Sequence, residues 1–280
     1  MNEYAYYNGV FTPYNAAAIP LSDRSIFFAD AVYDVVVGRG KILYQFDEHL
    51  DRILGNAKAI GLCNLPDKYE ITEAAKELVE LAEGDEFMLY IQLSADARRR
   101  AHSRENVAVN LLMTVTECEL PKELTEIRAI TLPDLRHRYC DLKTTSLLPA
   151  VLSVEEARRR GADIAVFHRG GTVTECSYAN VAMIKEGRII THPYDSDILP
   201  GITQINLERI ADRLGIARER RPFTVEEMCR ADAVVISSTT KLIKLCTEID
   251  GVALRTPSRD VAATLFDALR DDLYSKTARE

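Results

Sequence analysis

The sequence has no C-x-x-C pair, although six cysteines are spread over its 280 residues. Zinc sites and disulfide frameworks place cysteines at close or paired spacings, so neither is expected, and no metal site is predicted. Cysteines scattered in this way are typical of reduced thiols, most of them buried. Repeats and low-complexity segments are also absent.

The chain also lacks an excess of basic residues. Its net charge of −8 and its pI near 5.3 exclude a protein that binds nucleic acid non-specifically, because such proteins need surplus Lys and Arg. No stretch approaches the roughly 18 uninterrupted apolar residues of a membrane span. The start, MNEYAYYNGVF, has no basic segment followed by an apolar one. We therefore expect a cytoplasmic protein with no nucleic-acid or membrane partner.

The composition is that of a globular protein. Hydrophobic residues make up 47% of the chain and charged residues 28%, which suits one large domain or two modest ones. In the first part, Asn8-Gly9 predicts a hairpin turn, and a second hairpin is expected over 31–46 with its turn at Gly38-Arg39-Gly40. A helix is expected to begin with Asp47 as its N-cap and to end at Gly61. A second helix over 67–83 and paired strands over 87–96 and 107–117 follow.

The pattern changes at the proline-marked segment 118–124, which we interpret as a linker. Beyond it we expect a strand near 127–132, a helix over 153–160 and four strands within 163–193. A helix opening at 201, a strand, turn and strand over 231–251, and an amphipathic helix from 260 complete the chain. Hairpins outnumber strand-helix-strand crossovers, so two α/β modules with largely antiparallel sheets are predicted.

Four separated elements have the residue types needed to hold a phosphorylated aldehyde such as pyridoxal phosphate. Lys143, in CDLKTTSLL, could form a Schiff base if its amine is kept neutral. Glu175 could pair with a protonated pyridine nitrogen, which makes the ring an electron sink. Residues 201–203 lie at an expected helix start, which favours a phosphate, and the hydroxyls of 237–240 could donate to it.

Each element has a simpler interpretation when taken alone. Lys143 and Glu175 could be solvated surface residues, because both types are rarely buried. The Gly-Ile-Thr turn could be a plain helix cap, and Ser-Ser-Thr-Thr could be an ordinary turn.

The order of these elements resembles the class IV (fold type IV) pyridoxal-phosphate-dependent aminotransferases over almost the whole chain. The resemblance rests on Lys143, then VTECSYANV, LPGIT and SSTT. It implies a mixed α/β (α+β) fold of two domains: an N-terminal α/β sandwich over 1–118, the linker over 119–124, and a β-barrel-like α/β domain over 125–280 that carries the lysine. The cofactor residues that it implies are Lys143 (covalent bond), Glu175 (ring nitrogen), Ser177, Leu199 (ring support), Ile202 and Thr203 (phosphate, through backbone N–H groups) and Thr239 (phosphate).

Arg52 is a further phosphate ligand implied by the resemblance, because DEHLDRIL matches the family's E-H-x-x-R pattern. An arginine can grip a phosphate as a bidentate donor. The helical wheel alone favours a different interpretation, since Arg52 lies roughly opposite the apolar stripe of Leu50, Ile53 and Leu54 and would then be solvated.

The segments FADAVYDVVVGRG and ARRRAHSRE are most similar to the D-amino acid transaminases within class IV. In that branch a tyrosine and an Arg-x-His pair bind the substrate α-carboxylate, which implies Tyr33, Arg100 and His102 here. The Arg and His come from the neighbouring subunit there, so a homodimer is implied. The alternative for this segment is an exposed basic loop.

The predicted reaction transfers the amino group of a D-amino acid, D-alanine above all, to a 2-oxo acid such as 2-oxoglutarate. Two positions depart from the pattern, because Tyr178 and Gln204 replace the serine and arginine that are common in these relatives, and this leaves side-chain preference open. Three alternatives remain at this point: a branched-chain aminotransferase, an aminodeoxychorismate lyase of the same fold, and a binding protein that keeps the fold without activity.

Overall fold

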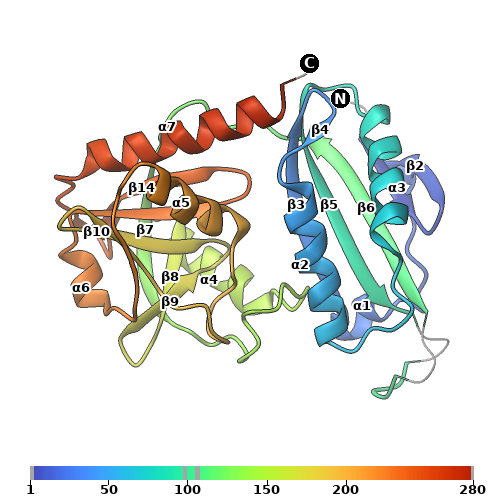
Figure 1. Ribbon diagram of the computed structural model, residues 1–280. Coiled ribbons are helices and arrows are strands. Elements are labelled where there is room, and N and C mark those ends of the chain that lie inside the picture. Colours follow the sequence, from blue (N-terminus) through green and yellow to red (C-terminus); the bar gives the residue numbers. More distant parts are fainter. Residues whose placement is uncertain (1–2, 97–99, 105–107, 279–280) are drawn as a thin grey trace. The chain divides into compact units, whose positions relative to one another are not determined.

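A computed structural model describes residues 3–96, 100–104 and 108–278 (Figure 1). The chain forms two compact units. The first unit runs to Leu120 and also takes in Leu142–Ser146 and the C-terminal stretch from Tyr274, while the second holds Pro121–Asp141 and Leu147–Leu273. The segment with Lys143 thus groups with the first unit, whereas the sequence analysis assigned it to 125–280. The reason is a backbone pairing with an early strand, described below.

The first unit is built on an antiparallel sheet with the strand order β2-β1-β6-β5-β3-β4. Its strands are β1 (Tyr4–Tyr7), β2 (Val10–Pro13), β3 (Ala31–Arg39), β4 (Ile42–Leu43), β5 (Glu86–Ala95) and β6 (Val109–Glu117). Its helices are α1 (Arg24–Phe28), α2 (Phe46–Ala59) and α3 (Lys68–Leu81), with a 3-10 turn, η1, at Tyr14–Ala16.

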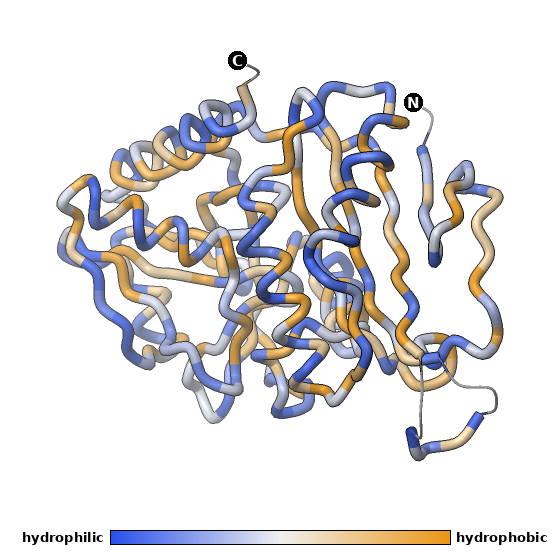
Figure 2. Tube along the Cα trace, turned by 45° about the vertical axis from the view of Figure 1, so that its right-hand side comes forward, coloured by the Kyte–Doolittle hydropathy of each residue, from blue (hydrophilic) through white to orange (hydrophobic). Residues whose placement is uncertain are grey.

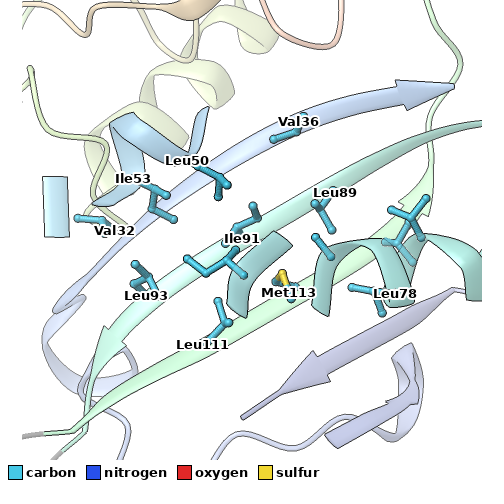
Figure 3. Close-up of a cluster of buried hydrophobic side chains, with 14 of the residues drawn as sticks. Val32, Val36, Leu50, Ile53, Leu78, Leu89, Ile91, Leu93, Leu111 and Met113 are labelled. Carbon is cyan, nitrogen blue, oxygen red and sulfur yellow. The ribbon is translucent and has the colours of Figure 1, made fainter. Parts of the chain in front are cut away.

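Helices α2 and α3 cover one face of this sheet and bury the core of the first unit, as Figure 3 shows. The apolar residues of each helix recur every three or four positions, so that one stripe faces the strands. Complete burial of a Leu, Ile or Val side chain contributes about 1.5–3 kcal/mol relative to exposure. Labelled members of this core are Leu50 and Ile53 of α2, Leu78 of α3, Val36 of β3, Ile91 of β5 and Met113 of β6.

Local sequence signals explain most element boundaries in this unit. Asn8 and Gly9 both adopt positive φ (46° and 91°), which confirms the expected tight hairpin turn. Asp67 caps α3 in a capping box with Glu70, again as expected. Asp47 as the N-cap of α2 was wrong, because Gln45, with φ 53°, precedes a helix that begins at Phe46.

The second hairpin turns later than expected. Gly38 lies inside β3, and the turn falls at Gly40 and Lys41, which both have positive φ. A Cβ at position 38 would lie 2.3 Å from the ring of Phe87, so the glycine is required by the close approach of that ring and not by the turn.

The second unit contains a larger, mixed sheet with the order β12-β11-β10-β13-β14-β7-β8-β9, and β15 pairs with β14. Its strands are β7 (Glu126–Pro133), β8 (Ile164–Arg169), β9 (Thr172–Cys176), β10 (Asn180–Lys185), β11 (Arg188–Thr191), β12 (Arg218–Arg220), β13 (Ala233–Ser238), β14 (Leu242–Ile249) and β15 (Val252–Ala253). Its helices are α4 (Leu148–Arg159), α5 (Ile202–Arg213), α6 (Val225–Cys229) and α7 (Arg259–Lys276), whose last residues belong to the first unit.

This sheet curls until its two ends meet. The chain that leaves β12 returns to the opposite end strand, β9: the N–H of Val173 donates to the carbonyl of Phe223 over 2.9 Å, and Thr172 forms a β-bridge with Thr224. The expected barrel-like C-terminal architecture is confirmed. The sheet is less antiparallel than expected, because β7 pairs in parallel with both β8 and β14 and β11 pairs in parallel with β12.

Two helices of the second unit begin before the expected position. α4 starts at Leu148 and not at Ser153, with Pro149 in its first turn, where the missing N–H of proline does no harm. α7 begins at Arg259, one residue early, and Figure 2 shows the alternation of polar and apolar residues along it. Within the described part of the chain, none of the helices combines the length and apolar character that crossing a membrane requires.

Candidate active site

Lys143 lies in a short segment, Leu142–Ser146, that pairs with the start of β3. The N–H of Tyr33 donates to the carbonyl oxygen of Lys143 over 2.9 Å, and Thr144 forms a β-bridge with Val32. The Lys143 Nζ lies 4.5 Å from the centre of the Tyr33 ring. The structure therefore brings together two predicted site residues that are far apart in the sequence.

A second tyrosine supports Tyr33 from the neighbouring strand. The rings of Tyr33 and Tyr90 stack with their centres 5.5 Å apart, and the Tyr90 hydroxyl donates to Gln92 Oε1 over 2.7 Å. Burial, with a smaller effect of Tyr33, raises the pKa of Tyr90 above its ordinary value, so this phenol stays neutral. The stack fixes the ring that faces the lysine.

Arg52 is not solvated, so the interpretation from the helical wheel was wrong. Its side chain is only 11% exposed, and its Nε and Nη2 donate to Oδ2 and Oδ1 of Asp34, each over 2.8 Å. His49 Nδ1 lies 2.7 Å from the same Oδ1. The cause is the fully buried carboxylate in the middle of β3, which the spacing of α2 alone does not reveal. The bidentate pair fixes the plane of the guanidinium group.

The charge on Asp34 is maintained by its neighbours. Burial alone would raise the pKa of Asp34, but the charges and hydrogen bonds of Arg52 and His49 outweigh it and hold this pKa well below its ordinary value. Asp34 therefore stays ionised near neutral pH and keeps Arg52 oriented.

Arg100 and His102 both pack against the ring of Phe28, which ends α1. The Arg100 guanidinium lies 5.0 Å from the ring centre, and the His102 ring meets Phe28 edge to face at 5.3 Å. Both residues are exposed. The described contacts thus sort the predicted residues of the first unit into three groups: Lys143 with Tyr33, Arg52 with Asp34, and Arg100 with His102.

Glu175, at the end of β9, is 5% exposed, and both of its carboxylate oxygens accept hydrogen bonds. Oε2 accepts from Asn180 Nδ2 and from the N–H of Leu199, each over 3.0 Å, and Oε1 accepts from Arg136 Nη1. Several donors in a buried setting fix the direction of this carboxylate. Solvation, the simpler interpretation from the sequence, does not apply to Glu175.

Arg136, which contacts Glu175, was not predicted from the sequence. It is bonded to Asp134 through Nε (2.9 Å) and Nη2 (2.8 Å), and its guanidinium lies 4.8 Å from the ring centre of Phe167. Burial acts against the charge of Arg136, but Asp134 and Glu175 raise its pKa above the ordinary value, so it stays positive beside Glu175. The sequence signal for Arg136 was the charged run DLRHR directly after an apolar strand. This run becomes informative only when Glu175 is known to be the partner of Arg136.

Residues 199–203 form a turn that leads into α5, with Gly201 as N-cap. This N-cap brings no side-chain hydrogen bond to the first turn, where Ile202 and Thr203 are both buried. Ser237 of the SSTT segment is 3% exposed, and its hydroxyl has no partner among the described residues. A bare helix start with a buried, unpaired hydroxyl fits a phosphate group, because it offers donors that the protein itself does not satisfy.

Two strand ends bring these elements of the second unit together. Asn180, at the start of β10, lies opposite Ser237 of β13 in the sheet. The Asn180 side chain donates both to the carbonyl of Leu199, over 2.8 Å, and to the carboxylate of Glu175. The carboxylate, the turn before α5 and the SSTT strand end, which continues into Thr239, therefore form one connected group.

Ser177 is one of the cofactor residues that the resemblance implies. Its hydroxyl is buried, lies 3.0 Å from Ser153 Oγ as an acceptor, and donates to the carbonyl of Ala165, while its N–H also bonds Ala165. Both groups are thus used inside the second unit. Of the two departures from the family pattern, Tyr178 is 59% exposed and Gln204 is 1% exposed.

Gly201→Ala is expected to weaken cofactor binding. A Cβ at this position would lie 2.0 Å from Asn180 Oδ1, so Asn180 must move and release Glu175 and Leu199. We expect the dissociation constant for pyridoxal phosphate to rise at least about tenfold, measured by fluorescence titration of the apoprotein. Gly55→Ala is the control, since a Cβ at Gly55 in α2 meets nothing within 4 Å and should leave binding unchanged. Equal binding by both variants would contradict the role given to this close contact.

The comparisons with known proteins identify the family of the chain. The family model for class IV amino-transferases matches residues 31–249. The chain is 34% identical over 254 residues to a D-alanine aminotransferase of Staphylococcus aureus, covering 89% of this chain and 90% of that protein. It is 30% identical over 280 residues to a D-alanine aminotransferase of Bacillus licheniformis, covering 98% of both. The chain belongs to the class IV aminotransferases.

Solved structures share the fold at lower identity. A branched-chain aminotransferase from Thermoproteus uzoniensis superimposes with a TM-score of 0.90 at 22% identity, covering 99% of this chain and 96% of that one. A branched-chain amino acid aminotransferase from Thermobaculum terrenum in its PLP form gives 0.85 at 19% identity, covering 98% and 95%. A putative 4-amino-4-deoxychorismate lyase from Legionella pneumophila gives 0.84 at 20% identity, covering 92% and 96%. These likenesses concern the fold alone.

Proposed function

We propose that this aminotransferase uses pyridoxal 5'-phosphate to move the amino group of a D-amino acid, with D-alanine as donor, to a 2-oxo acid such as 2-oxoglutarate, giving D-glutamate. The observation that carries the proposal is the placement of the Lys143 amine against the ring of Tyr33. The D-alanine aminotransferases among its curated relatives supply the choice of substrate.

Seven residues are proposed to hold the cofactor. Lys143 would bond its aldehyde carbon, and Glu175 would accept from its ring nitrogen. Arg52, oriented by Asp34, is the proposed charged ligand of the phosphate. The remaining proposed contacts are backbone N–H groups at Ile202 and Thr203, the hydroxyl of Thr239, and Leu199, which would support the ring.

Bound pyridoxal phosphate supplies a ring that accepts the electron pair released at the substrate α-carbon. The protein moves the proton. Lys143 Nζ would act first as a general base, taking the proton from the substrate α-carbon, and then as a general acid that gives this proton up again. Glu175, fixed by Arg136 and Asn180, would pair with the protonated ring nitrogen of the cofactor.

The substrate carboxylate is assigned to Tyr33, Arg100 and His102. A carboxylate is bound best by a charged donor together with oriented neutral donors, and the arginine and histidine are two positions apart in an irregular segment that can direct both the same way. In the related D-amino acid transaminases the Arg and His reach the active site of the neighbouring subunit, so the proposal includes a homodimer.

The surface of α4 supports a homodimer. Leu148, Val151 and Leu152 lie on one side of this helix and are 68%, 54% and 59% exposed. Exposed apolar side chains at such a spacing form a contiguous patch of the kind that is usually covered in an assembly. We also place the enzyme in the cytoplasm, a proposal supported by its six cysteines, all of which are free.

A visible spectrum of the purified holoenzyme tests the substrate. We expect D-alanine to bleach the long-wavelength absorbance of the bound cofactor, because the first half-reaction consumes its aldehyde, while L-alanine and L-leucine leave the spectrum unchanged. Bleaching by L-leucine alone would point to a branched-chain aminotransferase. Release of pyruvate from aminodeoxychorismate without an amino acceptor would point to a lyase, and a colourless preparation that binds no added cofactor would contradict the whole proposal.

A further inference from the structure

Arg24, the first residue of α1, has a buried side chain whose guanidinium contacts both Asp30 and a distant stretch of backbone. Its side chain is 5% exposed, and its Nε donates to Asp30 Oδ2 over 2.7 Å. The other two nitrogens reach the backbone of a distant segment: Nη1 donates to the carbonyl of Ala101 and Nη2 to the carbonyl of His102 over 3.3 Å. One guanidinium therefore holds two consecutive peptide groups at the Arg100–His102 segment.

The side chains of the same segment rest on α1. Phe28 lies under three groups: the Arg24 guanidinium at 4.5 Å from its ring centre, the Arg100 guanidinium at 5.0 Å and the His102 ring at 5.3 Å. Arg24 and Phe28 lie one turn apart in the helix and so present one surface. The backbone and the two functional side chains of the segment are thus held by the same short helix.

This helix is itself firmly anchored. Its N-cap, Asp23, is 1% exposed and accepts from the N–H of Ser25 over 2.8 Å. The other oxygen of Asp23 accepts from Ser94 Oγ (2.7 Å) and Asn110 Nδ2 (2.9 Å), which lie on the central strands β5 and β6. The chain of contacts runs from the sheet through Asp23 and Arg24 to the segment.

We propose that Arg24 is a positioning residue that sets the conformation of the Arg100–His102 segment and thereby the affinity for the substrate carboxylate. The inference rests on the proposed role of Arg100 and His102. A guanidinium is required because only its planar fork of donors can satisfy Asp30 and two adjacent carbonyls at once. Lysine keeps the charge beside Asp30 but cannot span all three acceptors.

Arg24→Lys is therefore expected to raise KM for D-alanine at least about tenfold, with kcat and the cofactor spectrum little changed, since a misplaced carboxylate ligand weakens substrate binding. In the Arg100→Ala/His102→Ala background, the same change should add less than about twofold, because its effect acts through those two residues. Phe28→Leu is a second variant that removes the shared ring while retaining an apolar side chain. It should show the same effect on KM.

Trypsin cleavage after Arg100 gives a readout that does not depend on activity. Release of the two carbonyls should increase the rate of this cleavage at least about tenfold in Arg24→Lys, with the melting temperature of the protein nearly unchanged. Arg104→Lys is the matched control, because Arg104 also pairs with Asp30 Oδ2, at 3.3 Å, while the two carbonyls stay with Arg24. It should change neither cleavage nor KM.

The outcomes separate this inference from the proposed function. If the wild-type enzyme does not react with D-alanine, the proposed function is overturned. The rates of trypsin cleavage would still show whether Arg24 holds the Arg100–His102 segment. Unchanged cleavage in both Arg24→Lys and Phe28→Leu overturns the inference. So does an equal increase of KM in the presence and absence of Arg100 and His102, which would indicate a general effect on the fold.

Discussion

Lys143→Ala is expected to abolish transamination, with kcat reduced by on the order of 10⁴-fold or more, because the proposed covalent link to the cofactor and the proposed general base would be lost together. The segment around it should keep its conformation. The carbonyl of residue 143 still accepts from the N–H of Tyr33, and Thr144 still pairs with Val32, since these contacts use the backbone. The loss should therefore be chemical and not structural.

Borohydride reduction followed by peptide mapping is the measurement. In the wild type the reduced cofactor label should be found on the peptide that contains Lys143, and in the variant no peptide should carry it. Lys76→Ala is the control, because Lys76 pairs with Glu73 on the exposed surface of α3, and this variant should retain both label and activity. A label on another lysine in the wild type, or full turnover by the Lys143 variant, would refute the assignment.

Asp34→Asn is expected to have the second-largest effect, on both stability and cofactor binding. The change leaves Arg52 without its buried counter-charge, and the loss of one partner of a buried pair costs about 3–5 kcal/mol. The Arg52 guanidinium also loses its bidentate acceptor, so the phosphate should bind more weakly. Urea unfolding of the apoprotein and titration with pyridoxal phosphate measure the two effects separately.

Asp51→Asn provides a matched control next to Arg52. Asp51 is 67% exposed and pairs with Lys68 on the surface, so its loss should change the free energy of unfolding by less than about 1 kcal/mol. If the two asparagine variants were equally stable, the buried pair would not have the importance given to it here.

The difference in stability between wild type and Asp34→Asn should depend on pH. The pKa of Asp34 is lower in the folded protein than in the unfolded chain, so its stabilising contribution is complete above the ordinary carboxyl range near pH 4. That contribution is lost progressively as the pH falls toward the folded-state pKa. Unfolding curves recorded from pH 7 downward should therefore show the two proteins converging only in acid.

Signals that act over a few residues were sufficient for much of the fold. Asn8-Gly9 specified a tight turn, and Asp67 with Glu70 specified the start of α3, because each signal is satisfied by its own backbone. Gly38 and Asp47 misled for the opposite reason. Gly38 is required by the close approach of the Phe87 ring from another strand. The start of α2 is set by Gln45, two positions before Asp47, which adopts a left-handed conformation that is not typical of glutamine.

The same distinction between local signals and tertiary contacts applies to the site residues. The family pattern pointed to Lys143 and Glu175, but the residues that hold the site in shape lie in other elements. Asp34 orients Arg52 from a strand, and Arg136 reaches Glu175 from a loop. Neither partner follows from helical or strand periodicity, because the pairing depends on which buried charges meet after the chain has folded. The same reason explains why the helical wheel alone placed Arg52 on the solvated face.

The five residues Leu142–Ser146 have a consequence for recombination. They lie between two stretches of the second unit in the sequence, yet their backbone completes the edge pairing of β3 in the first. A fragment that ends at Leu120 would lack Lys143, and a fragment that begins at Pro121 would carry it without the strand with which its segment pairs. A chimera of two homologous enzymes would therefore need to take Leu142–Ser146 from the same parent as the N-terminal half, and not from the parent that supplies the flanking residues.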